Sequence, residues 1–534
     1  MAGTIETIVL LLAVLVAVAI AARRLNVAPS ILLVIAGVGL ALVPGLPRIE
    51  LAPELVLLGI LPPLIYSAGV SMSWREFRFN LRPIVLLAFG SVIFTTCAVA
   101  AASHWLLGLP WPVGFVLGAI VAPPDVVAPL AIARRLRLPR RLLVVLEGEG
   151  LVNDATALVL YRFAVAATAT GIFSLGQASA TFGAIVIGEI AYGIGVGWLS
   201  LRVRRWAREP RVEITLSLMT PYLAYWIPEH LGGSGVLATV AAGLYVSWKG
   251  PLLIPSATRL QGIFFWDLII YLIEGLVFLL TGLQARTLIE QVNSFSLRDL
   301  LMATALTAAI VIAARFIWIF PATYIPRWSS ALRQRDPSPS WKWVFVLAFT
   351  GVRGVVSLAA ALAIPLTLAS GHPFPHRDLI LFVTFGVIII TLVGIGLTLP
   401  LVIRLLGVAS AGDDEHLREQ EAELTARQAS IDVAERKLDE LTASRNLPDE
   451  IADYLRMRHV HRRRQFPATM QDGWEDTRLA AEIRMELINA ERGFLFQLLR
   501  EGKLTDETRR RIERELDLEE AAIACRRDGV APPL

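Results

Sequence analysis

An amide and two acids stand close together inside an otherwise apolar run, residues 142–169. Helical rise places Asp154 about 18 Å from the start of this run, near the middle of a bilayer. Asn153 adjoins it, and Glu149 lies four residues before Asn153, on the same helical face. Carboxylate and amide oxygens suit hard cations, and a carboxylate can bind a proton instead. We therefore expect Asp154 to bind a proton or a monovalent cation, with Asn153 as a neutral ligand.

A third acid, Asp125, directly follows Pro123 and Pro124 in the apolar run 112–132. Proline has no N–H and its ring clashes with the preceding turn, so a helix should open there. Open backbone inside a bilayer is tolerated only where it is buried in protein or lines a wet cavity. We expect the carbonyl of Pro124 and the carboxylate of Asp125 to belong to the cation site. A proline kink capped by Asp125 is the structural alternative.

Arg353 lies between Gly351 and Gly354 in the apolar run 343–369. A charge near the bilayer centre costs at least about 2.5–3.5 kcal/mol, so an unpaired arginine is improbable there. The glycines permit the helix to unwind. Glu149 is expected at a similar depth, so we predict a structural ion pair between Glu149 and Arg353. The alternative is a glycine-rich helix contact with a snorkelling arginine.

These residues belong to a long apolar body that we predict to be an all-α, polytopic membrane protein. It contains about thirteen runs long enough to cross a bilayer. They are residues 5–22, 28–44, 51–71, 83–107, 112–132, 142–169, 178–201, 212–228, 234–248, 265–284, 299–325, 343–369 and 378–407. Odd-numbered gaps between the runs carry 21 Lys and Arg, and even-numbered gaps carry 4. By the positive-inside rule, the N-terminus is outside and the C-terminal tail is cytoplasmic.

The two interrupted runs are the fifth and the twelfth. A separation of seven is expected if spans 1–6 and 8–13 are inverted repeats on either side of span 7. Discontinuous helices at matching positions in two repeats are typical of the binding site of a transporter.

The end of the chain has a different composition. Residues 1–410 carry a net charge of +11 and residues 411–534 a net charge of −7. We predict a transmembrane domain over 1–410 and a cytoplasmic helical domain over 411–534, with a regulatory or dimer-stabilising role. Leu417, Leu424, Ile431 and Leu438 recur every seven residues, which suits a helix pair or a dimer contact. Breaks are expected at Pro448, near Pro467 and at Gly502.

A basic cluster in this tail combines His459 and His461 with Arg462, Arg463 and Arg464. It could bind an anionic lipid or an acidic ligand, although a solvated helix face is the simpler reading. Elsewhere the basic excess lies in short turns between apolar runs, so no nucleic-acid partner is expected. The sequence has two cysteines, no phosphate-binding glycine loop and no metal-spaced Cys/His set. Neither an enzyme nor a bound cofactor is indicated.

The body resembles bacterial sodium/proton exchangers of the monovalent cation:proton antiporter-1 family over nearly all of residues 5–407. The motifs that carry the resemblance are Leu61-Pro62-Pro63-Leu64-Ile65-Tyr66, Ala122-Pro123-Pro124-Asp125, Asn153-Asp154 after Glu149, Ser234-Gly235-Val236-Leu237-Ala238, Gly282-Leu283-Gln284 and Arg353-Gly354.

The resemblance implies a homodimer in the plasma membrane, with a dimerisation bundle and a core bundle that moves like an elevator. It implies crossed broken helices in spans 5 and 12, and electroneutral exchange of one cation for one proton. Asp154 would hold the cation and the proton in turn, supported by Asn153 and Asp125, with Glu149 and Arg353 as the structural ion pair.

Three departures from the family pattern remove possible oxygen ligands. Many relatives have Thr or Ser at the position of Pro124, and some have Ser at the position of Gly150 and Glu at the position of Ser67. They leave the choice between Na⁺ and K⁺ open. Na⁺/H⁺ exchange is the leading interpretation and K⁺/H⁺ exchange the first alternative, while a cation channel is the alternative from another class.

Overall fold

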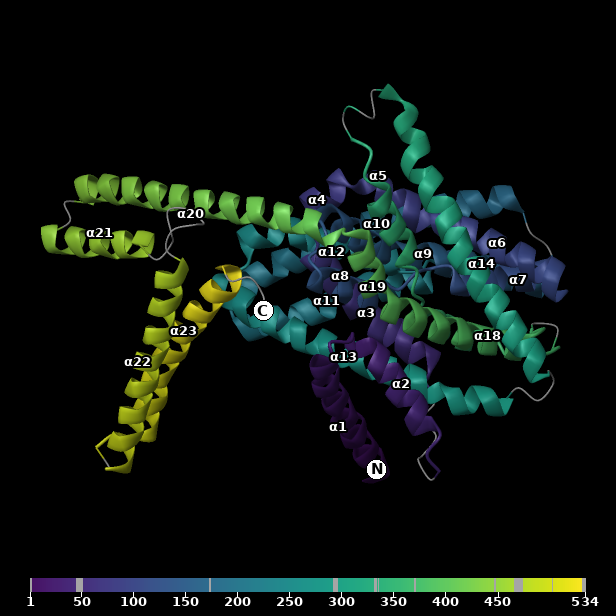
Figure 1. The fold of residues 1–534 in the computed structure, drawn as a ribbon, viewed down its shortest axis with the longest axis horizontal. Coiled ribbons are helices and arrows are strands. Elements are labelled where there is room, and N and C mark those ends of the chain that lie inside the picture. Colours follow the sequence, from purple (N-terminus) through teal and green to yellow (C-terminus); the bar gives the residue numbers. More distant parts are fainter. Residues whose placement is uncertain are drawn as a thin grey trace. The chain divides into compact units, whose positions relative to one another are not determined.

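The computed structural model describes residues 2–530, except for 45–50, 172–173, 292–295, 331–333, 335, 369–370, 446–447, 465–473 and 502. The described residues form helices and their connections, and no β-strand occurs among them (Figure 1). The chain divides into two compact units, Met1–Gly412 and Asp413–Leu534.

The first unit contains the apolar helices. Seven helices within the described ranges are long and apolar enough to cross a membrane: Glu6–Leu25, Leu81–Leu107, Leu175–Ala207, Val236–Leu253, Ser256–Glu290, Leu297–Trp328 and Arg377–Leu406. Shorter apolar helices are Pro29–Ala41, Leu55–Ser71 and Trp111–Val121. The all-helical, multi-span class is therefore confirmed, whereas thirteen crossings stay a prediction.

The helix bounds follow the predicted apolar runs closely. In chain order the elements of this unit are α1 (Ala2–Leu25), α2 (Pro29–Ala41), η1 (Leu55–Ile60), α3 (Leu61–Ser71), α4 (Trp74–Phe79), α5 (Leu81–Val85), η2 (Leu86–Ser91), α6 (Val92–Leu107), α7 (Trp111–Val121), α8 (Val127–Arg135), α9 (Arg140–Thr170), α10 (Leu175–Ala207), α11 (Pro210–His230), α12 (Val236–Leu253), α13 (Ser256–Gln291), α14 (Leu297–Tyr324), η3 (Ile325–Trp328), α16 (Trp341–Phe349), α17 (Val355–Leu362), α18 (Arg377–Ile389), η4 (Ile390–Ile395) and α19 (Gly396–Leu406). The runs 112–132 and 343–369 are each divided into two helices, α7 with α8 and α16 with α17.

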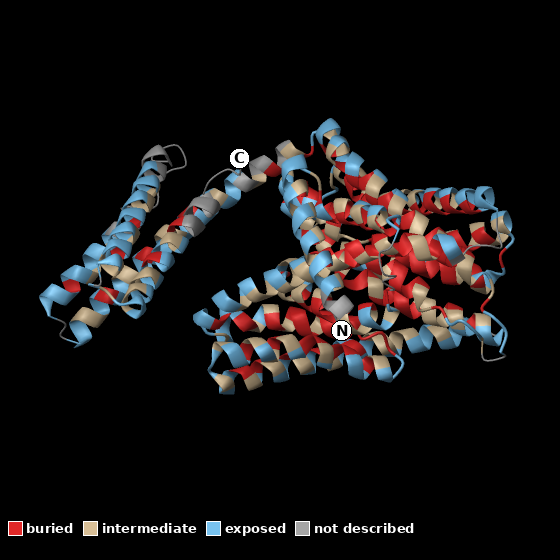
Figure 2. Cartoon of the chain, turned by 90° about the horizontal axis from the view of Figure 1, so that it is seen from below, coloured by how far each residue is buried: buried red, intermediate tan, exposed pale blue. Residues whose placement is uncertain are grey.

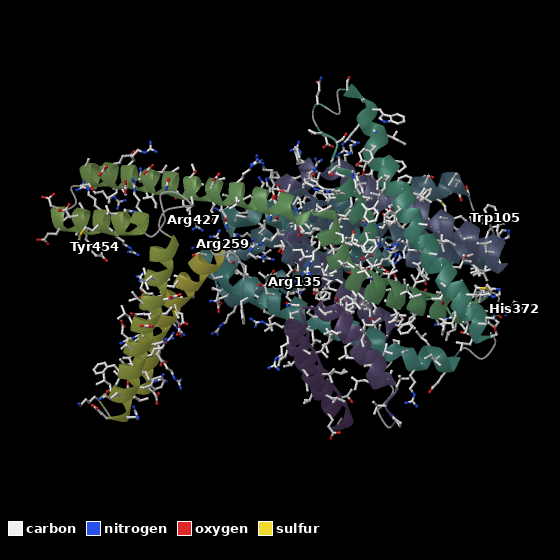
Figure 3. All side chains as sticks on the ribbon, in the orientation of Figure 1. Trp105, Arg135, Arg259, His372, Arg427 and Tyr454 are labelled. Carbon is white, nitrogen blue, oxygen red and sulfur yellow. The ribbon has the colours of Figure 1, made fainter. Side chains whose placement is uncertain are left out.

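Buried side chains concentrate where the helices of this unit pack together, and the outer helices expose many large apolar residues (Figure 2). The α9 helix is an exception to simple apolar packing, because it buries Glu149 and Asn153. In the view of Figure 3, Trp105 and His372 are both at the right-hand edge of the unit, and Arg135 and Arg259 are away from that edge.

The second unit consists of helical hairpins. They are built from α20 (Ala409–Arg445), which begins in the first unit, α21 (Asp449–Arg464), α22 (Trp474–Arg500) and α23 (Asp506–Val530). Arg456 pairs with Asp439 at 3.3 Å and Arg463 with Asp432 at 2.5 Å, which holds α21 beside α20. Ile488, Leu495, Leu516 and Ile523 form the apolar core between α22 and α23.

The predicted heptad positions on α20 behave unequally, since Leu424, Ile431 and Leu438 are buried while Leu417 is 51% exposed. Pro467 and Gly502, at two predicted breaks, lie outside the described residues, as do the side chains of His461, Arg462 and Arg464 in the basic cluster.

Candidate ion-binding site

Two interrupted helices meet inside the first unit. The first break, residues 122–126, separates α7 from α8, and the second, residues 350–354, separates α16 from α17. The N–H of Asp125 in the first break donates a hydrogen bond of 2.8 Å to the carbonyl of Val352 in the second. The Nε of Arg353 donates one of 2.5 Å to the carbonyl of Val121. Each break therefore satisfies backbone groups that the other leaves free, as buried backbone requires.

Close approach of the two breaks depends on Gly354. A Cβ atom at this position would overlap the carboxylate of Asp125. The same carboxylate accepts a 2.9 Å hydrogen bond from the N–H of Val127, which caps the start of α8. The Asp125 side chain is thus fixed at the point where the breaks touch, with its other oxygen unbonded by the described residues.

Asn153 on α9 reaches into the first break. Its Nδ2 donates a 2.7 Å hydrogen bond to the carbonyl of Pro124. Since a carbonyl can only accept, this bond orients the amide and directs Oδ1 the other way. Asn153 is 1% exposed and its Oδ1 is buried without a hydrogen-bond partner. A buried polar atom left without a partner is costly, so this oxygen is available for a ligand.

Asp154, the next residue, is partly buried and has no hydrogen bond or ion pair with any residue that the structure describes. It lies near enough to Asp125 for the two charges to interact. The structure thus brings together the predicted site residues Pro124, Asp125, Asn153 and Asp154. Two unneutralised carboxylates and one orphaned amide oxygen form an arrangement that a proton or an alkali cation can compensate.

Glu149 is neutralised by a partner that the sequence analysis missed. Arg315 on α14 donates to both of its carboxylate oxygens, at 2.5 and 2.8 Å, and Arg315 and Glu149 are 1% and 0% exposed. The Nη2 of Arg315 also donates to the carbonyl of Leu347, at 3.2 Å. This bidentate ion pair therefore connects α9 to both α14 and α16.

The predicted ion pair between Glu149 and Arg353 is wrong. Arg353 is 1% exposed and donates instead to backbone carbonyls, those of Val121 and Gly351, at 2.5 and 2.9 Å. The interrupted helices supply these carbonyls, because residues at a break leave acceptors that an intact helix would use internally. Helical rise gives the depth of an arginine but not its direction, so the sequence could not distinguish Arg353 from Arg315.

Three further residues bear on the site. Thr156, three residues after Asn153 on α9, has a buried hydroxyl without a hydrogen-bond partner. Glu274 on α13 is partly buried, and its charge interacts with that of Asp125. A Cβ atom at Gly150 would overlap the side chain of Val126. The space that a serine side chain at position 150 would need is therefore occupied by this valine.

The oxygen atoms of this site are suitable ligands for a hard monovalent ion. Within the described ranges, no three His, Cys, Asp or Glu side chains gather as a transition-metal site would require. Asp154 and Asp125 with the Asn153 amide offer oxygen ligands, and both acids can also bind protons. The arrangement can exchange one small cation for another without covalent chemistry.

Comparison with known proteins supports this reading. The sequence model of the sodium/hydrogen exchanger family, transmembrane region, matches residues 10–405. An uncharacterized Na⁺/H⁺ exchanger of Mycobacterium tuberculosis is 34% identical over 531 residues, 97% of this chain and 95% of that protein. A sodium, potassium, lithium and rubidium/H⁺ antiporter of Bacillus pumilus is 33% identical over 482 residues, 88% of this chain and 70% of that protein.

The fold has a counterpart among solved structures. The sodium/proton antiporter MjNhaP1 of Methanocaldococcus jannaschii aligns with a TM-score of 0.59 over 76% of this chain and 98% of that chain, at 21% identity. With the family match, these likenesses confirm the resemblance drawn from the motifs. The chain belongs to the sodium/hydrogen exchanger family, with the bacterial monovalent cation:proton antiporter-1 exchangers, and is a multi-pass membrane transporter of the antiporter type.

Proposed function

We propose that the protein exchanges a monovalent cation, Na⁺ in the first place, for H⁺, and that the carboxylate of Asp154 holds the two in turn. The observation that carries this proposal is the contrast between two acids on α9. Glu149 is neutralised by Arg315, whereas Asp154, five residues later, is left without a partner by the residues that the structure describes. A charge kept unneutralised inside a membrane protein is a site for a transported ion.

The cation shell would combine Asp154 with the Oδ1 of Asn153 and the carboxylate of Asp125. Asn153 is held by Pro124, and Asp125 is held by Val127, so both ligands are oriented before an ion arrives. Such preorganisation reduces the entropy lost on binding.

Exchange follows from mutual exclusion at Asp154. A bound proton or a bound cation neutralises the carboxylate of Asp154, and in this state the site can move across the membrane. The empty site, which carries one more negative charge, is retained because of its desolvation cost. One carboxylate that carries one positive ion in each direction gives electroneutral 1:1 exchange.

We further propose that the two interrupted helices cross in a core bundle that moves like an elevator against a dimerisation bundle, within a homodimer. On α9, the helix that carries Asp154, Arg162 pairs with Glu229 at the end of α11 and donates to the carbonyl of Gly233. Movement of α9 relative to α11 would have to break these contacts. The proposed topology places the N-terminus outside the plasma membrane and the helical tail in the cytoplasm.

K⁺/H⁺ exchange by the same mechanism is the second candidate. It is supported by the Bacillus pumilus relative, whose name covers sodium, potassium, lithium and rubidium, and by Pro124 and Ser67, which offer fewer side-chain oxygens than the family pattern. A cation channel is the alternative from another class, and it would dissipate a cation gradient without moving protons in return.

Everted membrane vesicles test the proposal. A proton gradient is established by respiration, and its collapse after addition of Na⁺, K⁺ or Li⁺ is followed with a pH-sensitive dye. The wild type should respond to cations, and Asp154→Asn should be inactive at unchanged abundance. Glu147→Gln is the matched control, because Glu147 lies on the same helix but pairs with Arg134 at 2.6 Å. This variant should keep its activity.

Normal exchange by Asp154→Asn would contradict the assignment of the carboxylate. A cation leak without coupled proton movement would favour the channel.

A further inference from the structure

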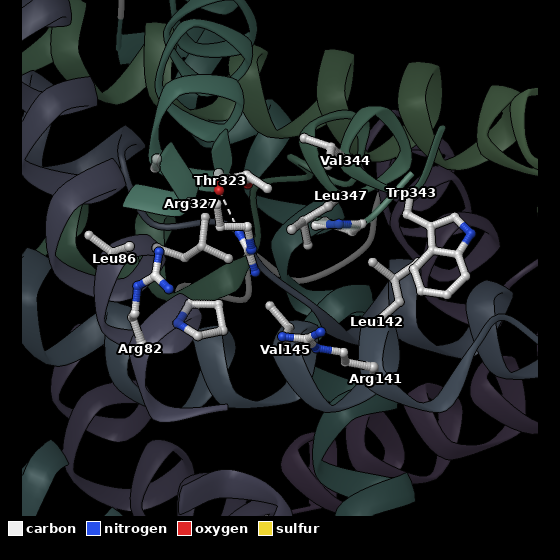
Figure 4. A pocket seen from close by; sticks show the side chains of 14 residues that line it. Arg82, Leu86, Arg141, Leu142, Val145, Thr323, Arg327, Trp343, Val344 and Leu347 are labelled. Carbon is white, nitrogen blue, oxygen red and sulfur yellow. Dashed lines mark hydrogen bonds between the residues drawn. The ribbon is translucent and has the colours of Figure 1, made fainter. Parts of the chain in front are cut away.

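A basic pocket lies at the ends of several helices of the first unit, apart from the ion site. Three arginines line it: Arg82 at the start of α5, Arg141 at the start of α9 and Arg327 in η3 (Figure 4). Its apolar lining includes Leu86, Leu142, Val145 and Trp343. The charge alternation assigns the gaps that border these helix ends to the cytoplasmic side.

The three arginines share one carboxylate. Asp336 accepts from Arg141 and from Arg327, each at 2.6 Å, and lies 3.7 Å from Arg82. The Nη1 of Arg82 is buried and has no hydrogen-bond partner. The pocket therefore holds more positive than negative charge, and the Nη1 of Arg82, 3.7 Å from the Oδ2 of Asp336, has no acceptor at hydrogen-bond distance.

Neighbouring acids do not supply the missing charge, because they are engaged by other arginines. Glu76 accepts from Arg140 through both oxygens, at 3.0 Å each, and Glu147 pairs with Arg134 at 2.6 Å. The excess positive charge of the pocket is therefore available to an external anion.

We propose that this pocket binds an anionic phospholipid, with its phosphate at Arg82 and Arg141 and an acyl chain along Leu142, Val145 and Trp343. Guanidinium groups bind phosphate oxygens in pairs, and basic pockets between transmembrane helices on the cytoplasmic side suit acidic lipid headgroups. The apolar lining favours a lipid over free phosphate, because free phosphate has no apolar group that could be buried against it. Trp343, at the third residue of α16, is the kind of side chain that lies at a membrane interface.

The bound lipid would stabilise the junction of α9, α14 and α16. Leu347 lines the pocket, and its carbonyl accepts the hydrogen bond from Arg315, the partner of Glu149. Filling the pocket therefore supports the same three helices that the buried ion pair connects.

Thermal unfolding of the purified, delipidated full-length protein in a neutral detergent tests the proposal. Phosphatidylglycerol should raise the apparent Tm, whereas phosphatidylcholine with the same acyl chains and inorganic phosphate should not. Each arginine removed should raise the half-effective phosphatidylglycerol concentration about fivefold, so Arg82→Gln with Arg141→Gln gives the larger shift. Arg259→Gln is the control: Arg259 also lies in a gap that the charge alternation assigns to the cytoplasmic side, but it donates to the carbonyl of Pro251 and does not line the pocket, so this variant should respond as the wild type does.

An unchanged lipid response in the Arg82→Gln/Arg141→Gln variant would overturn the proposal, and so would equal stabilisation by phosphatidylcholine. Stabilisation by inorganic phosphate as strong as that by phosphatidylglycerol would assign the pocket to a free anion instead. If the double variant does not fold, the same lipid titration of Asp336→Asn tests the proposal. Loss of the competing carboxylate should lower the half-effective phosphatidylglycerol concentration about fivefold, and no change would refute the charge argument.

Discussion

Replacing Arg315 with Met is expected to destabilise the protein by roughly 3–5 kcal/mol, because it leaves the carboxylate of Glu149 buried without its partner. Glu149 is 0% exposed and would lose two charge-assisted hydrogen bonds, of 2.5 and 2.8 Å. Glu149→Met should cost a similar amount, since it leaves the guanidinium of Arg315 unneutralised. The double variant removes both charges, and such replacements of a buried pair are often near neutral, so it should recover most of the loss.

Arg353 supplies the comparison. It is equally buried, but its bonds to the carbonyls of Val121 and Gly351 do not involve Glu149. Glu149→Met should therefore rescue Arg315→Met and should not rescue Arg353→Met. The assay is the apparent Tm of each purified variant in one detergent, measured by tryptophan fluorescence, with monodispersity confirmed by size-exclusion chromatography.

The outcome that would refute this reasoning is specific. If Glu149→Met rescued Arg353→Met as well as it rescued Arg315→Met, the pairing of Glu149 with Arg315 would not be the interaction that stabilises α9. Strictly additive losses in the Arg315→Met/Glu149→Met variant would lead to the same conclusion.

The remaining predictions concern transport in vesicles at matched protein abundance. Gly354→Ala should reduce exchange at least about tenfold, because the added Cβ displaces the carboxylate beside it; Gly394→Ala, with open space around it, should not. Glu274→Gln should raise the half-saturating cation concentration about fivefold, because it removes a negative charge near the site. Asp267 is exposed on the same helix, and Asp267→Asn should leave this concentration unchanged. On the acidic side of the pH profile, each unit of decrease in pH should raise the half-saturating Na⁺ concentration by up to about tenfold at a constant maximal rate, because in the proposed mechanism one proton and one cation compete for Asp154. A fall in the maximal rate alone would speak against this competition.

Much of the fold could be predicted from residue chemistry. Pro123 and Pro124 cannot continue a hydrogen-bonded helix, and the structure divides the helix there, between α7 and α8. The unwinding beside Gly351 and Gly354 was likewise expected from glycine. By contrast, η1, η2 and η4 are π-helical segments inside apparently regular apolar runs, and no residue type marks them.

The site shows where sequence reasoning reaches its limit. The grouping of Asn153 and Asp154 follows from their spacing, and their approach to the first break follows from the need to satisfy open backbone. The partner of Glu149 depends on the rotation of α14 and α16 about their axes, which is set by tertiary packing. Two buried arginines at similar depth were therefore equivalent in the sequence. The carbonyl of Val121 comes within reach of Arg353 only because the two breaks touch.

The attachment of Glu149 to α14 and α16 has a mechanical consequence for Asp154, which lies about 7.5 Å farther along the same rigid helix. A displacement of Asp154 along the membrane normal has to carry the Glu149–Arg315 junction with it, or else break a buried ion pair. In the proposed elevator mechanism, the bound ion would therefore move together with a coupled body of at least three helices. Turnover would then be limited by the slow, strongly temperature-dependent sliding of that body, and not by the fast rotation of one side chain.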